Sequence, residues 1–212
     1  MRKKASRGTG LHIESLDSRR LFASTLQLGG TSGADEIYVF VVGNYYQVSN
    51  NDVITNYPIN SVSGISIAGG NGNDDLEVNM AVNVPVSISG GNGDDIVFGG
   101  SGNDVLYGND GLDYMRGKNG NDFVDAGNGA NGTYSLTYGD NGNDTIYGGN
   151  QDDKMYGGTG SDTLYGNDGR NIYCGNDGDN NDDGAVDYFN HDPDQASSWV
   201  YGQPNDVNTW TS

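Results

Sequence analysis

A nine-residue repeat in the middle of the chain constrains the fold more than any other feature of the sequence. Its pattern is G-G-x-G-x-D-x-U-x, where U is apolar, and two clear copies are GGNGDDIVF at 90–98 and GGSGNDVLY at 99–107. Further copies follow in near-continuous register to GNDGRNIYC at 166–174, and an earlier one, GGNGNDDLE, occupies 69–77. A random polar chain does not keep a register of nine. The sequence therefore predicts a stack of repeated units.

Each repeat combines a turn with a short strand. Glycines at positions 1, 2 and 4 allow positive φ and let backbone carbonyls turn toward one point. Positions 7–9 predict a strand whose middle side chain points inward. One apolar residue in nine makes a core only when coils of two repeats stack, because the inward residues then form continuous ladders. The expected inward residues are Val97, Leu106, Met115, Val124, Ile146, Met155, Leu164 and Tyr173.

The array resembles the RTX, or hemolysin-type, calcium-binding repeat over roughly half of the chain. This resemblance implies an all-β fold, a right-handed parallel β-roll or β-solenoid, with two repeats in each coil and several Ca²⁺ ions between neighbouring turns. The array proper is expected to span residues 90–183. Residues 25–89 alternate strand and turn signals and are expected to form a β-meander or hairpin that caps the open end, because exposed strand edges aggregate.

The aspartates at position 6 are the expected metal ligands. Two repeats span 18 residues, so coils of two repeats place carboxylates one above another. The pairs expected on this basis are Asp95 with Asp113, Asp104 with Asp122, and Asp144 with Asp162. Because Ca²⁺ takes ~6–8 oxygen ligands at ~2.3–2.6 Å, two carboxylates and four turn carbonyls would complete one shell. The full set of expected carboxylate ligands is Asp74, Asp95, Asp104, Asp113, Asp122, Asp144, Asp153 and Asp162.

Backbone carbonyls at positions 2 and 4 are expected to supply the remaining oxygens. These residues are Gly91, Gly93, Gly100, Gly102, Asn109, Gly111, Lys118, Gly120, Asp140, Gly142, Gly149, Gly158 and Gly160. Side chains also depart from the pattern. Asn131 and Asn171 stand at position 6 and would make weaker sites, and Gln151 replaces the glycine at position 4. Four extra residues, 135–138, are expected to bulge out of the stack.

A further acidic stretch follows the array. Residues 179–184, DNNDDG, fit the start of an EF-hand-type calcium loop, but position 12 of that loop is Asn190 instead of glutamate. Alternatively, residues 175–180 form one more repeat turn with asparagine at position 6. Either interpretation makes Asp179, Asn181 and Asp183 weaker candidate ligands. Residues 184–212 are expected to form a C-terminal cap or tail.

The charge of the chain supports a metal-dependent fold. Four basic residues face 27 acidic ones after Arg20, a net charge of −23 in a chain of −19 overall. This surface repels nucleic acid and anionic lipid, so neither is an expected partner. Without cations the stacked carboxylates would repel one another, and the energy of calcium binding would become folding energy. Calcium is plentiful outside cells, so a secreted or cell-surface location is expected.

The N-terminal segment differs from the rest in composition. Residues 1–24 contain six of the ten basic residues, and IESLDSRRLFA at 13–23 is similar to the LEPR-XLL motif of large bacterial surface and exported proteins. The similarity suggests a sorting or leader element, and a disordered basic tail is the alternative. No secretory signal of standard form is present, no apolar run is long enough for a membrane-spanning helix, and Cys174 has no disulfide partner within the chain.

The sequence does not point to an enzyme. Outside the leader, His191 is the only histidine, and the many carboxylates fall at position 6 or in turns. Two functions remain: a calcium-binding β-roll module, or an adhesin or carbohydrate-binding protein that uses the roll as a scaffold for a glycan or protein partner. The second would use the aromatic residues expected at position 9, where the alternative is an aromatic ladder that only stabilises packing. These residues are Phe98, Tyr107, Tyr134, Tyr147, Tyr156 and Tyr165.

Overall fold

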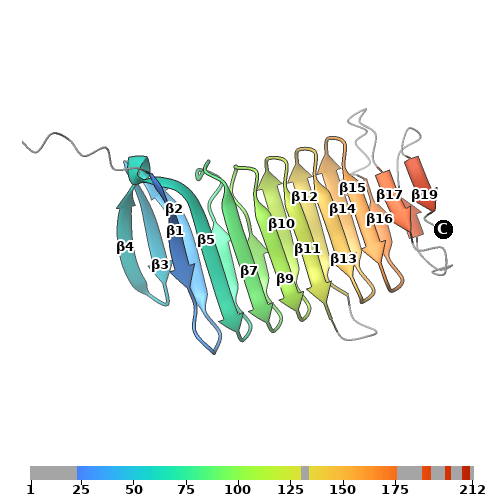
Figure 1. Ribbon diagram of the computed structural model, residues 1–212, viewed down its shortest axis with the longest axis horizontal. Coiled ribbons are helices and arrows are strands. Elements are labelled where there is room, and N and C mark those ends of the chain that lie inside the picture. The colour runs from blue at the N-terminus through green and yellow to red at the C-terminus, as the bar shows by residue number, and fades with distance from the viewer. Residues whose placement is uncertain (1–22, 130–133, 176–187, 192–198, 202–206, 211–212) are drawn as a thin grey trace, which may run out of the picture.

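The computed structural model shows a solenoid of stacked coils, each of which contributes one strand to each of two sheets (Figure 1). It describes residues 23–129, 134–175, 188–191, 199–201 and 207–210. One sheet has nine strands in the order β1-β5-β7-β9-β11-β13-β15-β17-β19, and every pair of neighbours is parallel. The other has ten, in the order β18-β16-β14-β12-β10-β8-β6-β2-β3-β4. The predicted all-β parallel roll is therefore confirmed.

The strands of the described residues have the following bounds. The nine-stranded sheet contains β1 (Ser24–Gly29), β5 (Val62–Asn71), β7 (Val86–Asn92), β9 (Val105–Asp110), β11 (Phe123–Asn128), β13 (Thr145–Gly149), β15 (Thr163–Asn167), β17 (Tyr188–His191) and β19 (Val207–Trp210). The ten-stranded sheet contains β2 (Glu36–Val42), β3 (Tyr45–Asn50), β4 (Val53–Pro58), β6 (Asp75–Val78), β8 (Ile96–Phe98), β10 (Tyr114–Asn119), β12 (Leu136–Asn141), β14 (Lys154–Thr159), β16 (Ile172–Cys174) and β18 (Trp199–Tyr201). A single 3₁₀ turn, η1 (Ile59–Ser61), precedes β5.

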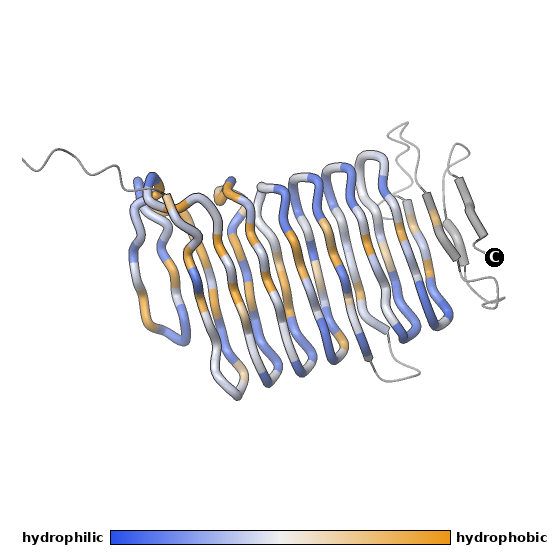
Figure 2. Tube along the Cα trace, viewed as in Figure 1, coloured by the Kyte–Doolittle hydropathy of each residue, from blue (hydrophilic) through white to orange (hydrophobic). Residues whose placement is uncertain are grey.

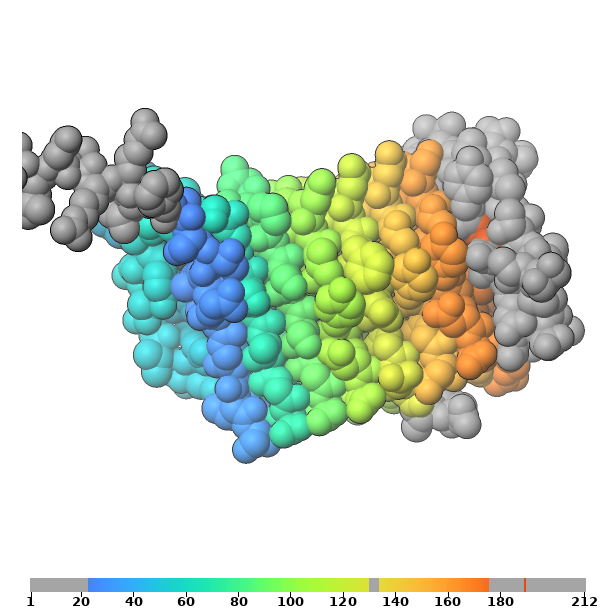
Figure 3. All heavy atoms as spheres, viewed as in Figure 1, coloured from blue at the N-terminus to red at the C-terminus, as the bar shows by residue number. Residues whose placement is uncertain are grey.

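The core lies between the two sheets and consists of the predicted inward ladders. All eight expected inward residues have no exposed surface, and they stack in register, as Leu106 does on Val124 and Val97 on Met115. Figure 2 shows the pattern, with hydrophobic segments recurring along the strands and hydrophilic ones at the turns. Each buried side chain of this size contributes about 1.5–3 kcal/mol. A coil adds only two such residues, so the core is thin and its stability depends on the stacking of many coils. The space-filling view in Figure 3 shows the coils as adjacent bands.

The N-terminal end combines an antiparallel cap with two wider coils. Strands β2, β3 and β4 form the expected meander, with Ile37 opposite Asn50 and Tyr46 opposite Tyr57. Strands β1, β5, β6 and β7 already belong to the parallel stack. The coil spacing is 39 residues between β2 and β6 and 21 between β6 and β8, because Glu36 pairs with Asp75 and Asp75 with Ile96.

The four extra residues lie upstream of the predicted bulge. Strand β12 pairs in continuous register with β10 and β14, and Thr137 takes the inward position opposite Met115. Since Asn128 pairs with Asp110 and Leu136 with Tyr114, the insertion falls between Asn128 and Leu136. The prediction that 135–138 bulge out is therefore wrong, because Leu136–Asn141 is a strand of the stack and Ser135 and Thr137 are buried.

Some predictions concern residues outside the described part of the chain. These are the LEPR-XLL-like leader, Asn131 and the acidic stretch with Asp179, Asn181 and Asp183. The proposed domain boundaries also stay predictions, although the parallel ladder continues through β17, β18 and β19. In the described residues, no helix is both long and apolar enough to cross a membrane.

Candidate metal centre

The turns of the roll form two rows, which we call the first and second edges. The first edge contains the turns that leave the nine-stranded sheet, and it lies along the bottom of the roll in Figure 1. Its position-6 residues are Asp35, Asp74, Asp95, Asp113, Ser135, Asp153 and Asn171. The second edge contains the turns that leave the ten-stranded sheet, and its position-6 residues are Val86, Asp104, Asp122, Asp144 and Asp162.

In most turns of both edges, one carboxylate oxygen ties the coil to the one before it. On the second edge, Oδ1 of Asp122 accepts the backbone N–H of Asp104 at 2.8 Å, and Oδ1 of Asp144 accepts that of Asp122 at 2.7 Å. On the first edge, Asp95 and Asp113 do the same for Asp74 and Asp95, at 2.8 and 2.9 Å. A hydrogen bond of this kind contributes about 0.5–1.5 kcal/mol, and about 1.5–3 kcal/mol when the carboxylate is ionised. The carboxylates therefore order the turns even before any ion is considered.

The structure confirms that carboxylates stack and adds pairs that the 18-residue rule misses. The three expected pairs all share an Oδ1 to N–H bond across 18 residues. Asp74 and Asp95 are joined across 21 residues, and Asp122 and Asp144 across 22. Coil length varies, but the position-6 side chains still meet, because strand register decides which residues stack.

The second carboxylate oxygen is the feature that calls for a cation. Within the described residues, no hydrogen-bond donor reaches the buried Oδ2 of Asp74, Asp95, Asp113, Asp122 or Asp144. A carboxylate oxygen that is buried without a donor is costly. Either a proton or a metal ion must compensate it.

The surroundings of these oxygens are themselves electronegative. A Cβ built on Gly139 would lie within 3.0 Å of both Asp144 Oδ2 and the carbonyl oxygen of Gly157 in the next coil. Gly117 stands in the same relation to Asp122 Oδ2 and Gly139 O, and Gly108 to Asp113 Oδ2 and Ala126 O. Two oxygen acceptors thus converge on a space that only a glycine leaves open. These position-1 carbonyls were not among the predicted ligands.

The pKa values of the buried aspartates reflect this environment. Burial raises the pKa of Asp122 to about 8, and the neighbouring charges of Asp144 and Asp104 add to the rise. Burial likewise raises the pKa to about 7 for Asp113 and Asp144, and to about 6 for Asp95 and Asp104. Near neutral pH the ion-free roll would therefore hold protons where a divalent cation could bind.

The first carboxylate of each edge is different, because backbone and side-chain donors satisfy both of its oxygens. Asp104 accepts the N–H of Val86 at 2.8 Å and that of Gly100 at 2.6 Å. Asp35 accepts from Thr31 N at 2.6 Å and from Asn51 Nδ2 at 2.5 Å. The Thr31 backbone bond, followed by the Asn51 bond, lowers the pKa of Asp35. These two residues close the rows of carboxylates at the N-terminal side.

The predicted carbonyl residues have the unusual backbone that was expected of them. All have positive φ except Gly100 and Gly102, including the non-glycines Asn109 (75°), Lys118 (79°) and Asp140 (74°). At Gly142 (φ 140°) a side chain would overlap the carbonyl oxygen of Gly120 in the coil before. Some position-2 carbonyls already accept inter-coil bonds, as Gly149 O does from Asp168 N at 3.0 Å.

A second polar ladder at position 5 escaped the sequence analysis. Asn103 Oδ1 accepts the N–H of Asn121 at 3.0 Å, and Asn121 Oδ1 accepts that of Asn143 at 2.8 Å. On the first edge, Asn73 and Asp94 act in the same way toward Asp94 and Leu112. The frequent Asn or Asp directly before position 6 is the signal that could have revealed it.

The C-terminal part of the first edge loses its carboxylates. Ser135 stands in register with Asp113, so it, and not Asn131, occupies position 6 of that turn. The Asn171 side chain accepts the N–H of Asp153 at 2.9 Å and so keeps the inter-coil bond without a charge. Burial raises the pKa of Asp153 to about 8. Its neighbours at position 6 are both neutral.

The donor set fits Ca²⁺ better than a transition metal. In the part of the chain that the structure describes, no three acidic, histidine or cysteine side chains gather at one point. A site would therefore combine stacked carboxylates with backbone carbonyls, an all-oxygen set that suits a hard cation. Asp74, Asp95, Asp113, Asp122 and Asp144 would hold the ions, with position-1 carbonyls beside them. Bound Ca²⁺ would supply the positive charge that these oxygens lack.

One family comparison agrees with this geometry. The sequence model of the RTX calcium-binding nonapeptide repeat matches the chain in four copies, at residues 89–124, 107–132, 138–164 and 147–181. The matches leave out 133–137, the stretch that contains Ser135. No curated protein and no solved structure matches the chain.

Proposed function

Since residues 89–181 carry RTX calcium-binding nonapeptide repeats, we propose that this chain is a calcium-binding β-roll that folds when calcium binds, as part of a secreted or cell-surface protein. The observation that carries the proposal is the row of buried Oδ2 atoms without donors, most of which lie beside a carbonyl oxygen of the next coil. A polar chain with a thin core gains little from burial alone, so the ions would contribute the decisive energy.

The location follows from the affinity that such a site needs. Sites built from two carboxylates and carbonyls bind calcium weakly compared with sites that gather three or more carboxylates, and extracellular calcium modules work at about 10⁻⁴–10⁻³ M. Inside a cell such a roll would stay empty and unfolded, and outside it would fold.

A calcium titration followed by circular dichroism tests the proposal. We expect little β signal in chelator and a cooperative gain of β signal at millimolar Ca²⁺. An equal concentration of Mg²⁺ should produce much less, because Mg²⁺ demands a tight octahedral shell and keeps its waters. Identical spectra in chelator and in calcium would refute calcium-dependent folding.

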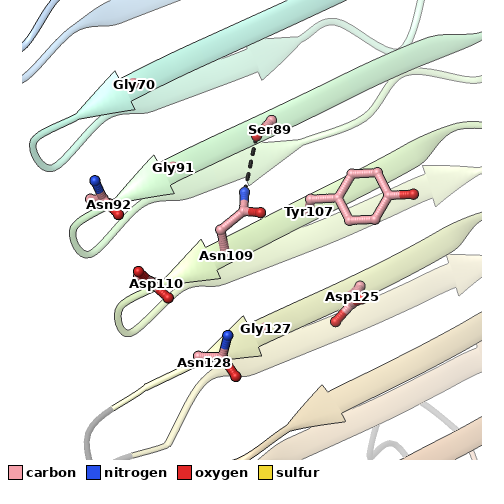
Figure 4. A pocket seen from close by; sticks show the side chains of 10 residues that line it. All are labelled: Gly70, Ser89, Gly91, Asn92, Tyr107, Asn109, Asp110, Asp125, Gly127 and Asn128. Carbon is pink, nitrogen blue, oxygen red and sulfur yellow. Dashed lines mark hydrogen bonds between the residues drawn. The ribbon is translucent and has the colours of Figure 1, made fainter.

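A second candidate function, carbohydrate binding, has one specific observation in its favour. Figure 4 shows the residues that line a pocket on the nine-stranded sheet, which include Tyr107, Asn109, Asp110 and Asp125. Tyr107 is 38% exposed, and Asn109 Nδ2 donates to Ser89 Oγ at 3.0 Å. An exposed aromatic ring next to polar side chains is a suitable surface for a sugar. A glycan array with the native chain and with Tyr107→Ala would test this function.

The aromatic residues also have a purely structural role. Ring contacts run along both outer faces, such as Tyr147 stacked on Tyr165 with centroids 4.6 Å apart, and Tyr138 on Tyr156 at the same distance. They include Phe123 at position 7, so the ladder is not confined to position 9. Tyr134 is not part of it, because the insertion shifts it to position 5, where Lys154 Nζ lies 3.9 Å from its ring.

A further inference from the structure

Position 3 of the repeat often carries an asparagine directly before the glycine of position 4. An Asn-Gly step is chemically reactive, because the unhindered glycine nitrogen can attack the side-chain amide carbon Cγ. The N–Cγ bond forms, the Cγ–Nδ2 bond breaks, and Nδ2 leaves as ammonia with the glycine proton. Water then opens the resulting succinimide to aspartate or isoaspartate. The steps among the described residues are Asn71-Gly72, Asn92-Gly93, Asn119-Gly120, Asn128-Gly129 and Asn141-Gly142.

On the second edge, the roll holds the glycine of each step from both sides. Its N–H donates to a backbone carbonyl of the next coil, as Gly120 does to Asn141 O at 2.9 Å and Gly142 to Thr159 O at 2.8 Å. On the other side, a Cβ on Gly120 would lie only 1.9 Å from Gly102 O of the coil before. The reactive nitrogen is therefore clamped between two coils.

The first edge holds two of its glycines in the same way and a third differently. Gly93 N donates to Asp110 O at 2.7 Å, and Gly72 has the equivalent bond to the next coil. Gly129 instead donates to a side-chain oxygen, Asn150 Oδ1, at 3.0 Å. A side-chain acceptor can rotate away while the coils stay stacked, whereas a backbone carbonyl cannot.

The clamp opposes each requirement of the reaction. The glycine nitrogen must lose its proton, which the inter-coil bond retains, and its peptide group must rotate, which the close packing of the coil before prevents. The asparagine side chains are engaged as well. Asn141 Nδ2 donates to Asn119 Oδ1, and Thr159 Oγ1 donates to Asn141 Oδ1, both at 2.9 Å. Reaction at these steps therefore requires that neighbouring coils separate.

We propose that the steps at Asn71, Asn92, Asn119 and Asn141 are sites of spontaneous deamidation that the roll protects and that react when its coils separate. Where loss of calcium is what separates the coils, the inference rests on the proposed calcium-dependent folding. Four sites of irreversible modification would then become accessible whenever the ions leave.

The two products should differ in their effect on the fold. Aspartate is compatible with position 3, because Asp110 stands there in the native chain and Gly111 N still donates to Asn128 O at 2.8 Å. Isoaspartate adds a methylene group to the main chain between positions 3 and 4. The close contact between glycines of successive coils leaves no room for this extra group. Isoaspartate should therefore prevent the affected coil from stacking again.

The rate of deamidation at each step tests the inference. The chain is kept at mildly alkaline pH in saturating calcium, in chelator, and in calcium with concentrated urea. A synthetic peptide of residues 117–123, GKNGNDF, gives the unprotected rate. Peptide mapping by mass spectrometry locates each product, and enzymatic methylation counts isoaspartate. In calcium we expect Asn119 and Asn141 to react more than about tenfold more slowly than the peptide, and Asn128 faster than either.

Each result has a definite meaning. Rates in calcium that equal the rate of the peptide would overturn the inference, because the roll would then give no protection. A rate at Asn128 as low as at Asn119 and Asn141 would also overturn it, because the backbone bond would then not be what protects. Fast reaction in chelator and in urea would support both the clamp and its dependence on calcium. Protection in chelator equal to that in calcium, but lost in urea, would support the clamp, and the proposed calcium-dependent folding would fail instead.

Returning calcium to aged chains tests the effect of the products. Chains kept in chelator should regain less β signal than fresh ones, in proportion to their content of isoaspartate. The control is Asn119→Asp, which carries only the ordinary product and keeps an acceptor for Asn141 Nδ2, so it should fold in calcium. Full recovery of chains rich in isoaspartate would show that the roll tolerates the longer main chain and would overturn this part of the inference.

Discussion

The two edges of the roll use the same repeat but differ in how continuously charge runs along them. On the second edge, Asp104, Asp122, Asp144 and Asp162 follow one another without a break. The first edge has a continuous row only from Asp35 to Asp113, after which neutral side chains at 135 and 171 alternate with Asp153. The difference shows that the same stack of strands accommodates either carboxylates or neutral side chains as the hydrogen-bond acceptors at position 6.

The largest expected effect is the dependence of stability on pH, because pH changes the charge of the two edges but not their packing. The raised pKa values of Asp122 (about 8), Asp144 and Asp113 (about 7) mean that the ion-free fold holds protons that the unfolded chain releases above about pH 4. Stability without calcium should therefore be greatest in acid and fall as the pH rises through 6–8. Calcium needs the ionised carboxylates, so its affinity should change in the opposite direction.

The measurement is the β signal of the chain in a strong chelator as the pH falls from 8 to 5. We expect the ion-free chain to gain structure as the pH falls, because folding takes up protons that the unfolded chain has released. At a pH where the ion-free chain is folded, calcium must displace those protons, so its affinity for the folded chain should rise by up to about tenfold per pH unit for each proton displaced. A β signal in chelator that does not depend on pH would mean that the rows hold no protons, and the electrostatic contrast between the edges would disappear.

A matched pair of substitutions tests the contrast directly. Asp122→Asn removes a charge between two ionised neighbours on the second edge, whereas Asp153→Asn removes one between two neutral neighbours on the first edge. Both keep one side-chain oxygen, which at 122 can still accept the N–H of Asp104. We expect Asp122→Asn to raise the calcium midpoint by about tenfold, which corresponds to about 1.4 kcal/mol. Asp153→Asn should change it by less than about twofold.

Isothermal titration calorimetry can supply the corresponding affinities. Equal losses in the two variants would show that continuity of charge along an edge does not matter. In that case the first edge would bind ions over its whole length.

The smallest effect concerns the position-5 ladder. Asn121→Leu gives the second edge the residue that the first edge has at Leu112. It removes the acceptor of the Asn143 N–H but no ion ligand, so we expect a loss of about 0.5–1.5 kcal/mol in unfolding free energy. After correction for this loss of stability, the calcium concentration at the midpoint of folding should equal that of the native chain. Urea unfolding in saturating calcium measures the loss, and Asn83→Leu, at an exposed position outside this ladder, serves as the control.

Much of the fold can be predicted from the sequence because periodicity determines which side chains face inward. All the predicted ladder residues from Val97 to Tyr173 are buried. The position of the insertion could not be predicted from the motif, for a physical reason. Residues 126–134, AGNGANGTY, match the repeat letter by letter. The register is decided instead by the burial of Thr137 and by the pairing of β12 with both of its neighbours. The Tyr138-Gly139 step, which matches Tyr107-Gly108 and Tyr147-Gly148, could have located the register.

The site could be predicted only in part. Position-6 aspartates are evident from the repeat, and their stacking follows from two repeats per coil. The facing position-1 carbonyls, and the closed ends at Asp35 and Asp104, depend on hydrogen bonds between residues of different turns. No periodic pattern specifies those contacts, since they arise from the exact packing of successive coils. The Gln151 to Ser135 bond likewise joins two departures that are 16 residues apart in the sequence.

The bonds between carboxylates and backbone give the roll a direction. At position 6, the aspartate of the later coil accepts the N–H of the earlier one, as Asp113 does for Asp95, whereas at position 5 the acceptor belongs to the earlier coil, as Asp94 does for Leu112. The buried position-6 N–H of a coil is thus satisfied only by the coil that follows it in the chain. Ending the roll after any coil would leave a buried N–H without its acceptor, whereas the coils toward the N-terminus would keep theirs. Growth of the folded array would therefore proceed one coil at a time from its capped end, and shortening it would weaken mainly the newly exposed last coil.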